Sequence, residues 1–260
     1  NEYLITQSNS MTLNDTIFAD SDLDQAFNVG NKYLLELSTC VYPNTVELGE
    51  YITIQGAADR ILLPSAKIEL DGFTVIESLS IGDHSDVILK QVTLDHLSEF
   101  SISNSRLFFE SPQTMDNQDE MTAPIQTISF SQNAAVNIEQ SVITTDATLN
   151  IGIDGDNDSS NSYVDMTIKD STIVMTTLAP LFDLNQISLR LENVLIITAG
   201  DGFILNNSKI SAINTYLLSP SDVDRCGTFF DLKSATILMN GQWSKTCHDV
   251  LYKIDTDSRL

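Results

Sequence analysis

A strand-like alternation of apolar and polar positions recurs along most of the chain. Each copy reads apolar, polar, apolar, polar and then a polar corner residue, with an aliphatic or aromatic residue three positions after the corner. The copies cover residues 87–91, 100–104, 136–140, 166–170, 189–193, 210–214 and, less regularly, 236–240. Because alternate side chains of a β-strand point to opposite faces, the pattern predicts strands with one buried face.

The corner residues set the length of the repeat. They are Gln91, Asn104, Gln140, Asp170, Asn193, Asn214 and Asn240, and from Asn104 onward they lie 36, 30, 23, 21 and 26 residues apart. This indicates a unit of about 21 to 23 residues with loop insertions of variable length. The interval from Gln91 to Asn104 is too short for a whole unit, so these two corners are expected on different faces of one turn. Asn and Asp suit a tight bend because they tolerate left-handed backbone conformations; Gln fits that explanation less well.

No helical segment separates the repeated strands, so they do not fit βαβ units. A solenoid, in which each turn stacks on the last and the aliphatic columns fill one interior, explains the repeat. Over about residues 22–247 the sequence resembles the single-stranded right-handed parallel β-helix, the pectin-lyase-like superfamily, as a non-catalytic member. The resemblance implies an all-β, right-handed parallel β-helix solenoid that forms one domain over residues 1–260.

The start of the chain fits the same resemblance. Residues 21–27 read as a helix N-cap and a short helix, and residues 33–37, 46–48 and 51–56 read as strands. Proteins of the superfamily often begin with such a capping helix, which covers the open end of the core. We expect an N-terminal cap over residues 1–30, solenoid turns over 31–247, and over 248–260 a C-terminal cap or a connection to further sequence.

Two polar segments interrupt the repeat, at residues 111–123 and 154–162. Insertions in a solenoid project as loops and often carry its binding function. In the first segment Asp116, Asp119 and Glu120 are candidate contact residues, and a solvated excursion without a ligand is the alternative.

The second insertion also resembles a calcium-binding loop. Its oxygen-bearing side chains fall at positions 1, 3, 5, 7, 9 and 12 of an EF-hand-like pattern, at Asp154, Asp156, Asp158, Ser160, Ser162 and Asp165. The match is imperfect, because Ser159 replaces the glycine of the sharp bend, Asp165 replaces the bidentate Glu, and the flanks read as strands. We therefore expect either a bound Ca²⁺ or a plain acidic turn.

Many β-helix proteins degrade polysaccharides, so the resemblance also implies an active site as an alternative. The stretch around Asp201 resembles a polygalacturonase strand with paired aspartates, but Gly202 stands in place of the second, and the Gly-His-Gly and Arg-x-Lys parts of that site do not occur. A glycosidase needs two carboxyl groups at a defined separation. A lyase needs a base such as Arg or Lys, yet Lys90, Arg106, Lys169 and Arg190 are expected to be isolated on outward strand positions. Asp201 remains the alternative catalytic candidate.

Charge and cysteines bear on the surroundings of the protein. With 13 Lys and Arg against 36 Asp and Glu, the net charge is −23, which argues against nucleic-acid partners and electrostatic membrane binding, and no apolar run predicts membrane insertion. Cys226 and Cys247 lie one repeat apart, so they could stack closely enough for a disulfide, which favours an oxidising compartment. Cys40 is then either buried or linked to another chain.

The leading expectation is a secreted or surface-displayed, non-catalytic scaffold for adhesion or carbohydrate recognition, with Ca²⁺ as a candidate cofactor. The alternatives are a β-helix polysaccharide lyase or hydrolase, and a structural subunit of an extracellular filament or coat that contacts neighbouring subunits.

Overall fold

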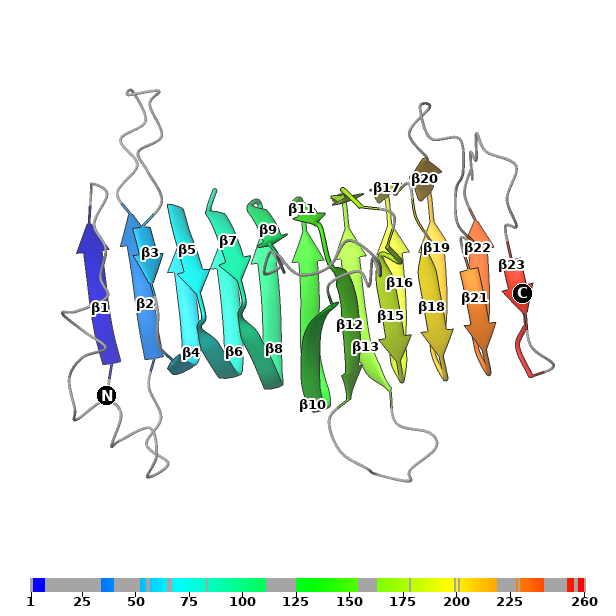
Figure 1. Ribbon diagram of the computed structural model, residues 1–260, viewed down its shortest axis with the longest axis horizontal. Helices are drawn as coiled ribbons and strands as arrows, with labels where there is room; N and C mark the ends of the chain where they lie inside the picture. The colour runs from blue at the N-terminus through cyan, green and yellow to red at the C-terminus, as the bar shows by residue number, and fades with distance from the viewer. Residues whose placement is uncertain are drawn as a thin grey trace, which may run out of the picture.

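The structure, a computed structural model, describes residues 2–7, 34–39, 52–54, 57–64, 67–82, 84–110, 125–153, 163–177, 179–198, 200, 202–218, 228, 230–240, 252–254 and 257–259. Within them every regular element is a β-strand (Figure 1). All pairings between these strands are parallel. The described part of the chain is therefore all-β, with parallel sheets.

The strands form two sheets. The 8-stranded sheet contains β3 (Ile52–Ile54), β5 (Lys67–Asp71), β7 (Asp86–Lys90), β9 (Arg106–Glu110), β11 (Val142–Thr145), β14 (Thr172–Met175), β17 (Leu195–Ile197) and β20 (Tyr216–Leu218). The main path of the 15-stranded sheet contains β1 (Glu2–Gln7), β2 (Leu34–Thr39), β4 (Ala57–Pro64), β6 (Thr74–Gly82), β8 (Thr93–Ser103), β10 (Ile125–Glu139), β12 (Thr148–Ile153), β15 (Phe182–Asn185), β18 (Phe203–Asn206), β21 (Phe230–Lys233) and β23 (Tyr252–Ile254). Its branch contains β13 (Val164–Lys169), β16 (Ile187–Glu192), β19 (Lys209–Ile213) and β22 (Thr236–Asn240).

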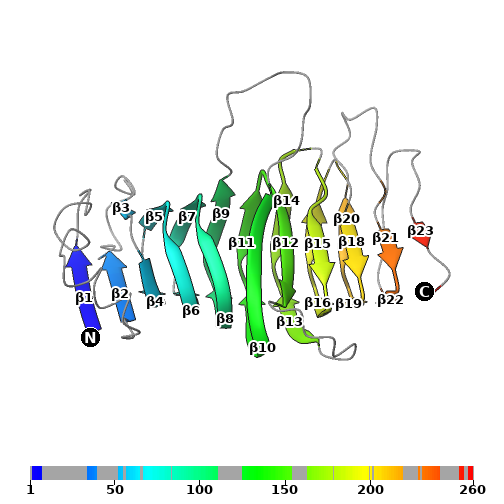
Figure 2. The ribbon, with the colours of Figure 1, turned by 60° about the horizontal axis from the view of Figure 1, so that its bottom comes forward.

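The larger sheet divides at the long strand β10. The first part of β10 pairs with β12, and its last residues pair with β13, so that two rows of strands continue from it (Figure 2). Beyond β10 the chain visits three rows in a fixed order: β12 pairs with β15, β13 with β16, and β14 with β17. The described strands therefore repeat in threes along this half of the molecule.

The apolar slots predicted from the repeat form the core. In the first six copies, all three slots (four and two positions before the corner, and three after it) are buried, as at Met166, Ile168 and Ile173. A column of aromatic rings adds to the interior: Phe203 stacks between Phe182 and Phe230, with ring centroids 5.3 and 5.4 Å apart. The prediction of strands with one buried face is confirmed for these copies.

The predicted corners are also confirmed up to Asn214. Gln91, Asn104, Gln140, Asp170, Asn193 and Asn214 all have φ near +50°, the left-handed region that reverses the chain between strands. Gln91 joins β7 to β8 and Asn104 joins β8 to β9, so the two corners lie on different faces, as their short spacing predicted.

The last copy of the repeat was predicted one residue out of register. The predicted corner, Asn240, pairs with Ile213 rather than with Asn214, and it ends strand β22. Consequently Ile237 is the buried residue, while Thr236 is exposed and Leu238 is 70% exposed. A shift of one residue exchanges the two faces of a strand, which explains why a polar residue, Thr236, stands at a position predicted to be inward.

A second column of corners was not predicted. It bends the chain within β8 and β10, at His96 and Asn133, and between the main path and the branch, at Gln186, Asn207 and Ser234, and all five residues have positive φ. In β8 and β10 this bend falls within one long strand, and around His96 the buried residues Leu94 and Leu97 are three positions apart, so the period of two is broken there.

Buried serines follow several corners and connect each of these corners to the next one. The backbone N–H groups of Ser85, Ser105 and Ser141 donate to the hydroxyls of Ser105, Ser141 and Ser171 respectively, at 3.1, 3.2 and 3.1 Å. The hydroxyls of Ser105, Ser141 and Ser171 each donate to the carbonyl oxygen two residues earlier. This ladder satisfies polar groups that would otherwise be buried without partners.

The predicted helix within residues 21–27 lies outside the described residues. In the range assigned to the N-terminal cap, residues 2–7 form β1, which pairs with β2.

Candidate functional site

Most of the predicted site residues lie outside the described residues. These are Asp116, Asp119 and Glu120 of the first insertion, Asp154, Asp156, Asp158, Ser160 and Ser162 of the second, the alternative catalytic Asp201, and all three cysteines, Cys40, Cys226 and Cys247. Asp165, the last residue of the calcium pattern, is described: it is exposed on β13. The strand flanks of that insertion, β12 and β13, agree with prediction. In the described part of the chain, no three His, Cys, Asp or Glu side chains are grouped to hold a metal ion.

A polar outer face covers the branch of the larger sheet. We call the outward side chains of β13, β16, β19 and β22 the polar face. Alternation along each strand sets them outward, and the strand register aligns them in columns. Asp165 pairs with Ser188, Ser188 with Lys209, and Lys209 with Thr236; the next column contains Thr167, Arg190, Ser211 and Leu238.

The polar face is hollowed into an open groove of about 610 Å³. Its rim and floor combine hydroxyls, one carboxylate, two cations and a few apolar side chains. The lining residues are Asp165, Met166, Thr167, Ser188, Leu189, Arg190, Lys209, Ile210, Ser211, Ile213, Thr236 and Leu238. Donors and acceptors of several kinds are therefore presented side by side on a rigid sheet.

The cations of the polar face have partners, which corrects the expectation that Lys169 and Arg190 are isolated. Arg190 donates through Nε and Nη2 to the Glu192 carboxylate. The ammonium of Lys209 lies 4.1 Å from the centroid of the Tyr163 ring. Lys169 Nζ lies 3.3 Å from Glu139 Oε1, and this hydrogen bond and charge raise the pKa of Lys169. These contacts hold positive groups in place on a strongly acidic protein.

Amide and carboxylate side chains are hydrogen-bonded to one another along the corner beside the polar face. Asn193 Nδ2 donates to Asp170 Oδ1 at 2.8 Å, and Asn214 Nδ2 donates to Asn193 Oδ1 at 3.2 Å. The corner is thus fixed by side-chain bonds as well as by backbone ones.

The main-path strands β15, β18 and β21 form a third outer row, beside the branch and the 8-stranded sheet. This row contains a half-buried carboxyl group at Asp183 on β15. Burial raises its pKa, while the charge of Lys233 and a hydrogen bond from Asn206 Nδ2, at 2.8 Å, oppose the rise. Asp231, two strands away on β21, shares this outward column with Asp183 and Ile204.

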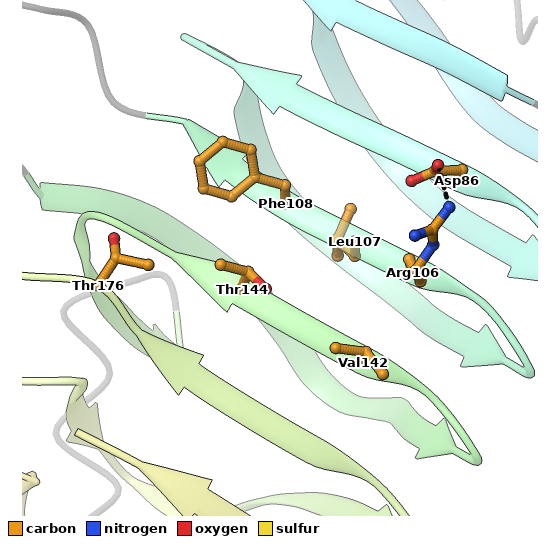
Figure 3. A pocket seen from close by; sticks show the side chains of 7 residues that line it. All are labelled: Asp86, Arg106, Leu107, Phe108, Val142, Thr144 and Thr176. Atoms are coloured by element: carbon orange, nitrogen blue, oxygen red, sulfur yellow. Dashed lines mark hydrogen bonds and ion pairs between the residues drawn. The ribbon is translucent and has the colours of Figure 1, made fainter. Parts of the chain in front are cut away.

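A smaller hollow of about 250 Å³ lies on the outer face of the other sheet. Figure 3 shows Phe108, Val142, Thr144 and Thr176 around it, with Arg106 donating to Asp86 at one end. The distance from Arg106 Nη2 to Asp86 Oδ2 is 2.6 Å, which also corrects the expectation of an isolated Arg106.

The groove of the polar face suits binding better than acid–base catalysis by paired carboxyls. Among its lining residues Asp165 supplies the single carboxylate, whereas glycoside hydrolysis ordinarily uses two. Sequence reasoning missed the groove because Arg190, Ser211 and Lys209 belong to different repeats. The repeat predicts that the strands at residues 189–193 and 210–214 lie side by side. It predicts which of their side chains are buried, but not which outward side chains meet.

Comparisons with protein-family models, with curated protein sequences and with solved structures find no match to this chain. None of the described segments forms a helix with the length and hydrophobicity that a membrane crossing needs.

Proposed function

We propose that the two sheets are the walls of a right-handed parallel β-helix of the pectin-lyase-like kind. The order of strands supports this, because each strand from β11 to β19 pairs with the strand three elements later. The regular columns of corner residues, serines and phenylalanines are typical of stacked turns. A right-handed path is expected because crossovers between parallel strands of one sheet are nearly always right-handed.

The function that the site supports best is non-catalytic recognition of carbohydrate by a secreted or surface-displayed scaffold. The groove of the polar face carries this proposal. Its volume of about 610 Å³ falls in the range of small-ligand sites, and its hydroxyl, carboxylate, guanidinium and ammonium groups match the donors and acceptors of a sugar chain.

Arg190 and Lys209 are the side chains expected to contribute most to binding. Hydrogen bonds to charged groups contribute about 1.5 to 3 kcal/mol, against about 1 kcal/mol for neutral ones. Both cations are already positioned, by Glu192 and by the Tyr163 ring, so little side-chain freedom is lost on binding.

The test is calorimetric titration of soluble polysaccharides, neutral and uronic-acid-containing, into wild type and the Arg190→Ala variant. Arg106→Ala is the matched control, because both arginines are 60% exposed and both pair with a carboxylate. We expect Arg190→Ala to weaken binding by about tenfold or more and Arg106→Ala to change it by less than about threefold, since tenfold corresponds to about 1.4 kcal/mol. If no polysaccharide binds, or if both variants lose affinity equally, the groove is not the site.

Calcium binding is tested in the same titration. Asp165 both ends the predicted calcium loop and lines the groove, so an ion held by that loop would adjoin the bound sugar. We expect Ca²⁺ to bind chelator-treated protein, to raise its melting temperature and to strengthen polysaccharide binding, and Asp156→Ala to abolish all three effects. Unchanged binding and melting in Ca²⁺ would leave recognition independent of the metal.

The enzyme remains the second candidate because Asp165 and Arg190 lie in one groove. A lyase could use a basic side chain to remove the proton next to a uronate carboxylate. Release of unsaturated or reducing sugar ends during the same incubations, lost in Arg190→Ala and kept in Arg106→Ala, would favour the enzyme over the non-catalytic scaffold.

A further inference from the structure

The groove of the polar face has an apolar end. Leu238 on β22 is 70% exposed and Ile213 on β19 is 39% exposed, and both line the groove. In the strand register Leu238 lies beside Ser211, two positions before Ile213, so the two apolar residues are diagonal neighbours. Their Cα atoms are then about 8 Å apart, since parallel strands are spaced by about 4.8 Å and alternate residues by about 6.6 Å. One methyl group placed between the two side chains can contact both.

Polar groups surround this apolar pair. Ser211 and Glu192 lie directly beside its two members in the register. Arg259, which is exposed, pairs with Thr236 and continues the neighbouring column of the polar face past β22. A single exposed apolar side chain is ordinary on a protein surface, but here two neighbouring ones lie within a hydrophilic groove. The pair is therefore an apolar spot inside the polar face, and it fits a small apolar group on an otherwise polar ligand.

Ser211 is placed to bind a polar group next to this spot. Its side chain is partly exposed on the outward side of β19, and within the described residues its hydroxyl makes no hydrogen bond. Arg190 lies on the other side of Ser211 in the same column. Its guanidinium has five N–H donors and gives only those of Nε and Nη2 to Glu192, so further donors remain for a ligand.

We infer that the groove binds a sugar that carries an N-acetyl group. This inference rests on the proposed carbohydrate recognition and names the class of sugar. An acetamido group joins a methyl group to an amide, which has an N–H donor and a carbonyl acceptor. The methyl group lies against Leu238 and Ile213, and the amide oxygen accepts from the Ser211 hydroxyl. The hydroxyl groups of the sugar ring then face the hydroxyls and cations of the groove.

Other sugar substituents match this end of the groove less well. A hydroxyl or carboxylate placed there would lose water against two apolar side chains that offer it no hydrogen bond, which costs free energy. A 6-deoxy sugar supplies a methyl group but no amide, so the Ser211 hydroxyl would be covered without a partner. The acetamido group satisfies both the apolar pair and the serine.

The test is NMR titration and saturation-transfer NMR with pairs of sugars that differ only in the acetamido group. The pairs are N-acetylglucosamine with glucose and N-acetylgalactosamine with galactose, and 6-deoxygalactose is the methyl-only probe. Leu238→Ser removes the apolar contact. Leu218→Ser is the matched control, because it makes the same change at an exposed leucine outside the groove. Circular dichroism and thermal unfolding verify that each variant is folded.

We expect wild type to bind each N-acetylated sugar about tenfold more tightly than its partner, the lower end of what one small apolar group contributes in an apolar pocket. The acetyl methyl protons should receive the largest saturation transfer. Leu238→Ser should reduce the preference to less than about threefold, and Leu218→Ser should keep it. Ser211→Ala should weaken binding of the N-acetylated sugars by about fivefold, through loss of one neutral hydrogen bond.

Three results would overturn the inference. They are equal binding of the two sugars in each pair, an equal loss of preference in Leu238→Ser and Leu218→Ser, and tighter binding of 6-deoxygalactose than of N-acetylgalactosamine. If polysaccharides still bind and depend on Arg190 in any of these cases, the proposed carbohydrate recognition stands without the N-acetyl preference. If neither these sugars nor any polysaccharide binds, both proposals fall.

Discussion

The polar face lies beside the outward side chains of β11, β14, β17 and β20, which we call the apolar face, and the two are built from consecutive strands of the same chain. β13 continues into β14 through Asp170, β16 into β17 through Asn193, and β19 into β20 through Asn214. On one side of these corners the outward slots contain Asp165, Arg190 and Lys209; on the other they contain only apolar residues, threonine and one tyrosine. The inward slots on both sides are equally aliphatic.

The difference shows that the inward and outward slots are under separate constraints. The interior requires aliphatic residues in register, because a slip of one position exchanges the two faces of a strand. The outward slots are not needed for the core, so their chemistry reports what each face contacts. Hydroxyls and paired charges suit a hydrated sugar, and an uncharged, flat row of side chains suits an apolar surface.

The strongest test of this separation is a substitution in the interior that both faces share. Phe203→Ala removes the middle ring of the Phe182–Phe203–Phe230 stack and leaves a cavity, so we expect the free energy of unfolding to fall by about 3 to 5 kcal/mol. Urea denaturation measures the loss. The outward neighbour gives the control: Ile204→Ala should lower the free energy of unfolding by less than about 1 kcal/mol. A comparable loss in both variants would contradict the separation of the slots.

A smaller effect is expected at the corner between the two faces. Ser141 follows Gln140 between β10 and β11, and its hydroxyl accepts from the N–H of Ser105 and donates to the Glu139 carbonyl. Ser141→Ala leaves these buried groups without their partner, so we expect a loss of about 1 to 3 kcal/mol in the free energy of unfolding.

Ser101→Ala is the control for Ser141→Ala. Ser101 donates to the Ser80 hydroxyl at 2.9 Å but is only partly buried, so water can replace the bond. We expect a change within about 0.5 kcal/mol. Thermal unfolding of the two variants in one buffer compares them directly; equal melting temperatures would show that the serine ladder does not stabilise the corner.

The sequence alone predicted the interior of this molecule well. The alternation of apolar residues at 166–170 and 189–193 identified the buried slots, because burial of a strand face imposes a period of two. Asn193 and Asp170 were recognised as corners because these residue types tolerate positive φ. The role of the serine that follows several corners was not predicted, since it depends on a serine hydroxyl that follows the neighbouring corner.

The outer surface was harder to predict, for physical reasons. At Ile237, Leu238 and Met239 three consecutive apolar residues fit either register, and pairing with β19 decides which one is buried. The bends at His96 and Asn133 lie inside continuous strands. The groove depends on neighbours that come from repeats 23 and 21 residues apart, so it becomes visible only when the outward columns are aligned.

The smallest predicted effect concerns the main-path row of β15, β18 and β21. This row differs from both faces because it contains the half-buried carboxyl group of Asp183. The pKa of Asp183 is raised in the folded protein, mainly by burial, so the folded state holds the proton more tightly than the unfolded state does. The stability of the wild type should therefore fall as pH rises from the ordinary value of 3.8 through the folded pKa.

Asp183→Asn does not titrate and keeps an oxygen to accept from Asn206. We expect it to be more stable than wild type at pH 7 by less than about 1 kcal/mol, because solvent screens a half-exposed group, and to lose that advantage near pH 3. Urea denaturation of both proteins at the two pH values measures the difference, and because the other acidic residues titrate equally in both, they cancel. An advantage that is the same at both pH values would mean that packing or the amide hydrogen bond, and not the ionised carboxylate, sets the stability of this row.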